Sequence, residues 1–329
     1  MPRLPRVHVQ ERPLMEFTNR VCQGFDLLDL DEDFSAEVIG ILAKAQALYP
    51  MAVHAGAVMS GHFHLVCSPD DVEQQAGFMG FFTRHLSKAA GRRHGWEGSM
   101  FTRRYSAMEI STEEKAQVAR LKYVLSNGCK EGLVGSPLEW PGVGFGQALV
   151  RDLVLRGVWV DRDGLYEARR RGEDVSEADF AETVELVLSP LPCWVRLSEE
   201  GYREAVLGVV GEIESETAAM HRVDGTRPLG ARRLLERDRR KRPLRPRQLE
   251  WRPCPWVYGR SFEVVASLLE GLKEKVAAYR VASELLRSGF RLARFPENCF
   301  PPALPFVSLG SGMALLVPGD PESGVSGSG

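Results

Sequence analysis

The first 130 residues alternate between stretches with the hydrophobic pattern of strands and stretches with that of helices. Four short runs, rich in apolar residues and loosely alternating, predict four strands. Only Ser60 and Gly61 separate the second run from the third, so these two runs are expected to pair as a hairpin. The predicted strands cover residues 17–25, 52–59, 62–67 and 100–110.

Three helical patterns accompany these strands, and each begins at polar residues that can cap a helix. The first opens at Asp31 and runs to Leu48, the second follows residues 68–71 to about Arg93, and the third follows residues 111–114. The third is expected to stop at Asn127 and Gly128. The order β-α-β-β-α-β-α predicts an α+β fold: a ferredoxin-like β-α-β-β-α-β domain with an antiparallel sheet and one additional helix, over residues 1–148.

Beyond residue 148 the composition changes several times. Residues 149–226 are acidic and are expected to be helical, and residues 227–260 form a basic linker rich in arginine and proline. Residues 261–318 are expected to form a mostly helical C-terminal unit, whose main helix at 261–288 carries an apolar stripe that we interpret as core. Residues 319–329 have the composition of a disordered tail.

Length and composition narrow the class of protein. With 329 residues the chain is long enough for two units that each bury a core. We find no run of 18 apolar residues and no signal peptide, so we expect a cytoplasmic protein with no membrane partner. The six cysteines stand singly, which argues against a zinc ribbon and against a secreted disulfide scaffold.

The net charge of −2 conceals a strongly basic segment. Residues 227–252 hold ten arginines and one lysine against three acidic residues, a local balance of +8. Its densest part is Arg239, Arg240, Lys241 and Arg242, and aromatic residues follow closely. Such a segment suits phosphate contacts and base stacking with single-stranded or hairpin DNA, although a solvated linker is the simpler alternative.

The candidate chemistry begins with two histidines. His62 and His64 stand two apart on a predicted strand, so both imidazoles project to the same side, as two metal ligands would. Phe63 between them is expected to point into the core. A bare pair of this kind also occurs on ordinary strands, but a mostly buried strand needs a reason for two polar rings.

A tyrosine and an amide stand one turn apart on the helix that follows the last predicted strand. Tyr123 and Asn127 share a helical face, so a hydroxyl and an amide oxygen could lie beside the histidine pair. The alternative is that Tyr123 is an ordinary half-buried helix residue.

Several motifs in the same order resemble those of single-tyrosine HUH transposases, in particular the REP-associated tyrosine transposases. The resemblance covers about residues 12–145. It lies in Val58-Met-Ser-Gly-His-Phe-His-Leu-Val66, Arg92-Arg-His-Gly95, Met100-Phe-Thr-Arg-Arg-Tyr105, Tyr123-Val-Leu-Ser-Asn127, Glu131-Gly-Leu-Val134 and Trp140-Pro141. Two positions depart from the family pattern: Gly61 stands where asparagine is usual and Gly128 where proline is usual.

The resemblance implies a metal-dependent endonuclease and strand transferase that acts on single-stranded or hairpin DNA. Tyr123 would attack the phosphate and form a 5′-phosphotyrosine link, while His62, His64 and Asn127 would hold Mg²⁺ or Mn²⁺. The family includes single-chain enzymes and homodimers that exchange the tyrosine helix, and the sequence does not choose between them.

Tyr105 is the competing nucleophile, although its predicted strand position favours stacking on a base or supporting the sheet. Arg103 and Arg104 beside it are candidate phosphate contacts. Three hypotheses stay open at this point. They are an active transposase-like nuclease, a domesticated DNA-binding protein of the same fold without turnover, and an unrelated ferredoxin-like protein in which the histidine pair is incidental.

Overall fold

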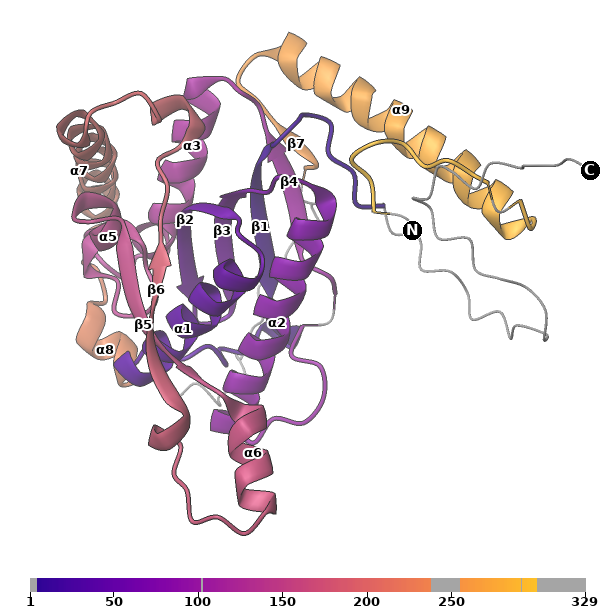
Figure 1. Ribbon diagram of the computed structural model, residues 1–329. Coiled ribbons are helices and arrows are strands. Elements are labelled where there is room, and N and C mark those ends of the chain that lie inside the picture. The colour runs from indigo at the N-terminus through magenta and orange to yellow at the C-terminus, as the bar shows by residue number, and fades with distance from the viewer. Residues whose placement is uncertain (1–4, 102, 238–254, 291, 301–329) are drawn as a thin grey trace, which may run out of the picture.

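The computed structural model describes residues 5–101, 103–237, 255–290 and 292–300. Its centre is a five-stranded sheet in the order β2-β3-β1-β4-β7 (Figure 1). The first four strands pair antiparallel, and β7 adds to β4 in parallel. The strands are β1 (Leu14–Arg20), β2 (Ala52–Met59), β3 (His62–Ser68), β4 (Ser106–Ile110) and β7 (Val257–Tyr258).

The order of the first four strands is that of a ferredoxin-like sheet, which confirms the predicted α+β class. Helices α1 (Glu32–Leu48) and α2 (Val72–His94) cover one face (Figure 1). Their caps were predicted from sequence: Asp31 accepts from the Phe34 amide, and Asp71 accepts from two amides of its own first turn. Phe63 points into this layer as expected, with its ring 5.0 Å from that of Phe82.

Three predicted boundaries differ from the structure. The first strand was predicted at 17–25 and covers Leu14–Arg20, with a short 3-10 turn at Cys22–Gly24. The last strand begins at Ser106 and not at Met100. The third helix, α3 (Glu114–Leu125), ends two residues before the predicted stop at Asn127, and a short helix, α4 (Asn127–Lys130), begins there. The left-handed glycine that follows these helices is Gly132, with φ of 66°.

The acidic region after residue 148 contains strands as well as the expected helices. Strands β5 (Val154–Val160) and β6 (Ala181–Val187) form a separate antiparallel sheet that packs on α1. The contact is close because glycines meet: a Cβ on Gly40 would lie 2.0 Å from the carbonyl oxygen of Val158, and one on Gly157 would lie 2.3 Å from the Gly40 nitrogen. The helices of this region are α5 (Gly146–Val150), α6 (Arg162–Arg170), α7 (Glu199–Asp224) and α8 (Ala231–Leu235).

One hydrophobic core extends from β1 to α8, so this region shares the core of the first 148 residues and does not form one of its own. The predicted C-terminal helix is α9 (Phe262–Arg287), which extends past the sheet edge at β7 (Figure 1). Leu268, Leu272 and Val276 of its apolar stripe are buried, in a small cluster with Val257. No described helix is both long and apolar enough to cross a membrane. The tail at 319–329 lies outside the described residues.

Both edges of the four antiparallel strands are covered, one by the segment after α4 and the other by β7. On the β2 edge, the Val58 amide donates to Val143 and the Phe145 amide donates to Gly56. On the other edge, β7 and the start of α9 are held by Glu113, whose carboxylate accepts from the amides of Arg260 (2.8 Å) and Ser261 (3.0 Å). Segments from the second half of the chain therefore complete the sheet on which the candidate site lies.

Candidate active site

The two histidines project from β3 to the sheet face that α1 and α2 leave free. His62 is the first residue of the strand, and the ring centroids of His62 and His64 lie 5.2 Å apart. His64 is buried, with 6% exposure. The predicted arrangement of two imidazoles on one side of a strand is present.

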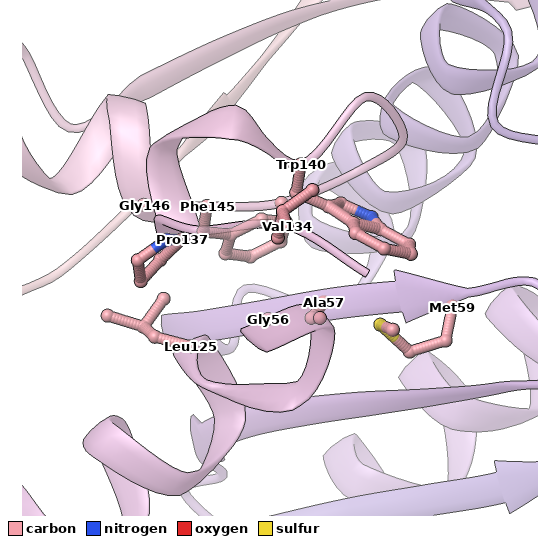
Figure 2. A pocket seen from close by; sticks show the side chains of 11 residues that line it. Gly56, Ala57, Met59, Leu125, Val134, Pro137, Trp140, Phe145 and Gly146 are labelled. Carbon is pink, nitrogen blue, oxygen red and sulfur yellow. The ribbon is translucent and has the colours of Figure 1, made fainter. Parts of the chain in front are cut away.

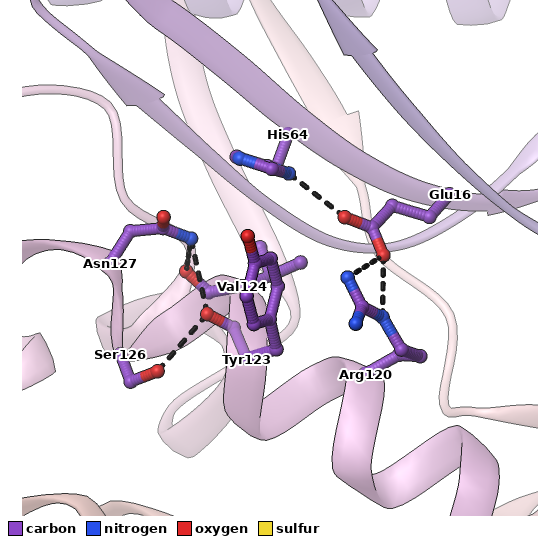
Figure 3. Close-up of polar contacts among 7 residues, drawn as sticks. All are labelled: Glu16, His64, Arg120, Tyr123, Val124, Ser126 and Asn127. Atoms are coloured by element: carbon purple, nitrogen blue, oxygen red, sulfur yellow. Dashed lines mark hydrogen bonds and ion pairs between the residues drawn. The ribbon is translucent and has the colours of Figure 1, made fainter. Parts of the chain in front are cut away.

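Helix α3 lies over β2 and β3 on this face and carries Tyr123 toward His64 (Figure 3). The centroids of the Tyr123 and His64 rings are 5.5 Å apart, with the ring planes at 78°. The structure therefore brings the candidate nucleophile to the histidine pair within a single chain.

Asn127, the first residue of α4, completes the group. Its amide nitrogen donates to the carbonyls of Tyr123 (3.1 Å) and Val124 (3.0 Å), which leaves its oxygen to accept a hydrogen bond from His62. The side chain is thereby fixed on the side of His64 and Tyr123, at the start of the helix that follows the tyrosine helix (Figure 3).

The pKa of His62 is lowered to about 3, chiefly by burial and in addition by the nearby His64 and Arg20, while the hydrogen bond with Asn127 opposes them. His62 is therefore neutral at physiological pH, which is the form that binds a metal. His62, His64 and Asn127 offer two imidazole nitrogens and one amide oxygen, a donor set that suits Mn²⁺ or Mg²⁺ with water in the remaining positions. Among the described residues, no three His, Cys, Asp or Glu side chains gather as a metal site.

A buried ion pair beside the site was not predicted. Glu16 of β1 accepts from Nδ1 of His64 at 2.8 Å with one oxygen, and its other oxygen takes two bonds from Arg120, one of them from Nε at 2.6 Å. The guanidinium carbon of Arg120 lies 4.0 Å from the centre of the Tyr123 ring (Figure 3). The sequence holds one signal for this pair, a glutamate inside the apolar run Leu14-Met15-Glu16-Phe17.

Further cations surround the tyrosine. Nζ of Lys130, on α4, lies 4.3 Å from the centre of the Tyr123 ring. Arg20 pairs directly with His62 across the sheet, so it projects to the same face, and it is exposed. Both side chains are placed to meet an anionic ligand, and neither was predicted.

One of the two departures from the family pattern has a structural explanation. A Cβ on Gly128 would lie 2.8 Å from the ring of Trp140, so glycine there permits close packing and is not by itself a sign of a decayed site. A Cβ on Gly61 would lie 3.2 Å from a carboxylate oxygen of Asp26, at the end of a side chain, and 3.3 Å from the Phe25 carbonyl oxygen. These distances do not require glycine at position 61.

Trp140 packs on Gly128 and donates from Nε1 to the Val58 carbonyl at 3.1 Å, which holds the segment after α4 on β2. Figure 2 shows the small, mainly apolar pocket between this segment, α4 and β2. Its lining includes Gly56, Ala57, Met59, Leu125, Trp140 and Phe145. No charged side chain lines it, so we interpret it as packing that supports α4 behind the site.

The residues predicted to contact DNA fall into three groups. Arg103 and Arg104 are exposed, before β4. Tyr105 is buried, with its ring against Phe17 and its hydroxyl accepting from Gln75 at 3.3 Å, so its environment fits support of the sheet and leaves no ring face for a base. Arg239, Arg240, Lys241 and Arg242 lie outside the described residues.

No protein-family model and no curated protein matches the chain. Among solved structures it is distantly similar to one described as the structure of the REP-associated tyrosine transposase bound to a REP hairpin, at 18% identity and a TM-score of 0.36. The match covers 46% of this chain and 87% of that chain. A similarity of this size assigns no role to any residue here, so the roles below rest on the geometry of the site.

Proposed function

We propose that this protein is a metal-dependent single-stranded DNA endonuclease and strand transferase that acts through a 5′-phosphotyrosine intermediate. One observation carries the proposal: Tyr123 of α3 lies against His64, with its ring centroid 5.5 Å away, and the Asn127 amide follows four residues later at the start of α4. A nucleophile beside three candidate metal donors is the minimum set for tyrosine attack on a phosphodiester.

In this proposal the Tyr123 oxygen attacks a backbone phosphorus and loses its proton. The bond from phosphorus to the 3′ oxygen breaks, so the products are a 5′-phosphotyrosine and a free 3′-hydroxyl. The energy of the phosphodiester bond is kept, and a second 3′-hydroxyl can reverse the step and join another strand without ATP.

The chain's own residues would divide the remaining work. His62, His64 and Asn127 would hold Mn²⁺ or Mg²⁺, which when bound neutralises charge on the phosphate and aligns it. Arg20 and Lys130 lie beside the histidines and the tyrosine and would contact the neighbouring phosphates. Hairpin ends are the substrate we favour, because the exposed Arg103 and Arg104 could contact a duplex stem while the site takes the single strand.

A second function is a DNA-binding protein of the same fold that does not cut. It is favoured by the large second half of the chain, which supplies none of the proposed nucleophile or metal-binding side chains. The two functions differ in whether DNA becomes covalently attached to Tyr123.

The deciding experiment incubates the full chain with labelled single-stranded hairpin DNA and Mn²⁺, then looks for a protein-DNA adduct that survives denaturation. We expect an adduct with the wild type and with Tyr105→Phe, and none with Tyr123→Phe. Tyr105→Phe is the matched control, because it removes a buried hydroxyl whose hydrogen bond is one accepted from Gln75. A shift in gel mobility without an adduct supports the binding protein, and an adduct that persists in Tyr123→Phe refutes the assignment of the nucleophile.

A further inference from the structure

Glu16 is a buried carboxylate with no part in the chemistry proposed above. Its side chain is 3% exposed and contacts two other side chains, those of His64 (7% of the side chain exposed) and Arg120 (13% of the side chain exposed). Burying charged groups at the centre of a sheet costs free energy, and replacing such a pair with apolar residues often leaves a protein no less stable. The pair therefore calls for an explanation other than stability.

We propose that Glu16 is a positioning residue that fixes the tautomer of His64 and, through Arg120, the place of the Tyr123 ring; this inference rests on the proposed function. An ionised carboxylate can only accept hydrogen bonds. Its 2.8 Å contact with Nδ1 of His64 therefore keeps the proton on that nitrogen and leaves the lone pair on Nε2. A histidine held in this way presents Nε2 to a cation in a single orientation.

The other oxygen of Glu16 extends the same control to the nucleophile. Arg120 donates to it twice, and the guanidinium then lies 4.0 Å from the centre of the Tyr123 ring and 5.0 Å from that of Tyr258. Tyr258 belongs to β7, so the second half of the chain closes the far side of this arrangement. A single carboxylate thus connects the strand with the candidate metal ligands to the helix with the tyrosine (Figure 3).

A second buried carboxylate in the same sheet provides the contrast. Glu109 of β4 is 2% exposed, and it accepts from the backbone amides of Val9 (2.8 Å) and Gln10 (2.7 Å). It faces the N-terminal segment and makes no contact with the histidines. Glu109→Gln is therefore a matched control, since it neutralises a buried carboxylate of the same sheet outside the site.

The first measurement needs neither metal nor DNA. Long-range proton-nitrogen NMR of the histidine rings distinguishes the two neutral tautomers, and His64→Ala identifies the signal. We expect His64 to carry its proton on Nδ1 in the wild type and in Glu109→Gln. In Glu16→Gln the amide can donate as well as accept, so a substantial share of the other tautomer is expected.

The second measurement is the affinity for Mn²⁺ alone, by titration calorimetry. Loss of a carboxylate that orients a ligating histidine typically weakens metal binding about 10–100-fold, and we expect this in Glu16→Gln but not in Glu109→Gln. If Glu16→Gln fails to fold with Arg120 unpaired, Glu16→Gln with Arg120→Met removes both charges and serves in its place.

The outcomes separate the two proposals. A wild-type His64 with its proton on Nε2, or the same His64 tautomer in Glu16→Gln as in the wild type, overturns the role of Glu16. A wild type that binds no Mn²⁺ overturns the metal-dependent function, while the tautomer measurement still decides whether Glu16 positions His64.

Discussion

Replacing Gly128 with alanine is expected to destabilise the protein, because the added methyl group meets atoms that are already packed. A Cβ at this position would lie 2.8 Å from Cε3 of Trp140 and 3.0 Å from Cγ2 of Val134. Carbon atoms in good contact are about 3.5–4.0 Å apart, so the indole must move by roughly 0.7 Å or more.

Trp140 has little freedom to move. Its Nε1 is bonded to the Val58 carbonyl at 3.1 Å, and the Val58 amide donates to Val143 at 2.8 Å in the segment that follows. Overpacking of this kind costs about 1–3 kcal/mol, and stretching the Trp140 hydrogen bond adds up to about 1 kcal/mol. The higher helix propensity of alanine returns about 0.5–1 kcal/mol. These contributions sum to between about 0 and 3.5 kcal/mol, and we expect the free energy of unfolding to fall by about 2 kcal/mol, near the middle of that range.

Urea unfolding of the full chain measures this change. The midpoint of the variant is compared with that of the wild type, and an unchanged slope m shows that the difference is one of stability. Gly208→Ala is the matched control, because Gly208 lies within α7 and a Cβ there would meet no atom within 4 Å. That variant should gain about 0.5–1 kcal/mol. If Gly128→Ala is as stable as the wild type while Gly208→Ala behaves as expected, the close contact with Trp140 does not explain why glycine follows Asn127.

Three further predictions concern charges. The imidazole of His62 should stay neutral in an NMR titration down to about pH 4, since its pKa is lowered to about 3, and Arg20→Gln should raise that pKa because one nearby positive charge is gone. Arg20→Gln should also weaken binding of single-stranded DNA and make the dependence on salt shallower by about one ion, as loss of one phosphate contact does; an unchanged slope would exclude that contact. The hydrogen bond from the Arg260 amide, followed by that from Ser111, lowers the pKa of Glu113 below its ordinary value of 4.5. Its stabilisation of the start of α9 is therefore present above that value and lost as the pH falls through the lower folded pKa. The protection of the Arg260 and Ser261 amides against hydrogen exchange, measured relative to the intrinsic rate at each pH, should fall there, and Glu113→Gln should remove this pH dependence of the protection.

The ferredoxin-like sheet could be predicted because its signals are local. Asp31 and Asp71 cap α1 and α2, which cover one face of the sheet. The two residues Ser60 and Gly61 form the whole turn between β2 and β3. Each of these features depends on residues within a few positions of one another, which is the range over which capping and turn preferences act.

Strands β5 and β6 were not predicted, although they pair with each other along their whole length and β5 is rich in apolar and β-branched residues. The sequence does not show their packing on a distant helix. β5 is half-buried and lies within a region that is acidic overall. Its position against α1 depends on the close contact between Gly157 and Gly40, which is more than 100 residues earlier in the chain. Close backbone approach between segments this far apart leaves no periodic pattern in either of them.

The candidate site likewise contains some residues whose relation follows from local spacing and others that only the tertiary fold brings together. His62 and His64 share a face because strands alternate, and Tyr123 and Asn127 lie one turn apart, so spacing alone relates the members of each pair. Glu16 and Arg120 are separated by 104 positions, and only the pairing of β1 with β3 beneath α3 brings them together. A charged residue within an apolar strand was the available signal, and it identifies a position without identifying its partner.

The position of the tyrosine helix depends on segments from the second half of the chain. Gln117 of α3 accepts from the Cys193 amide at 3.0 Å, and Lys122 pairs with Glu212 (2.9 Å) and Glu216 (2.7 Å) of α7. The ion pairs are exposed and contribute little each, but the buried Gln117 bond and the shared core fix where α3 lies. The boundary near residue 148 is therefore a boundary in composition and not in packing. The contact between Tyr123 and His64 therefore depends on residues beyond 148, because these residues hold α3 on the side that faces away from the sheet.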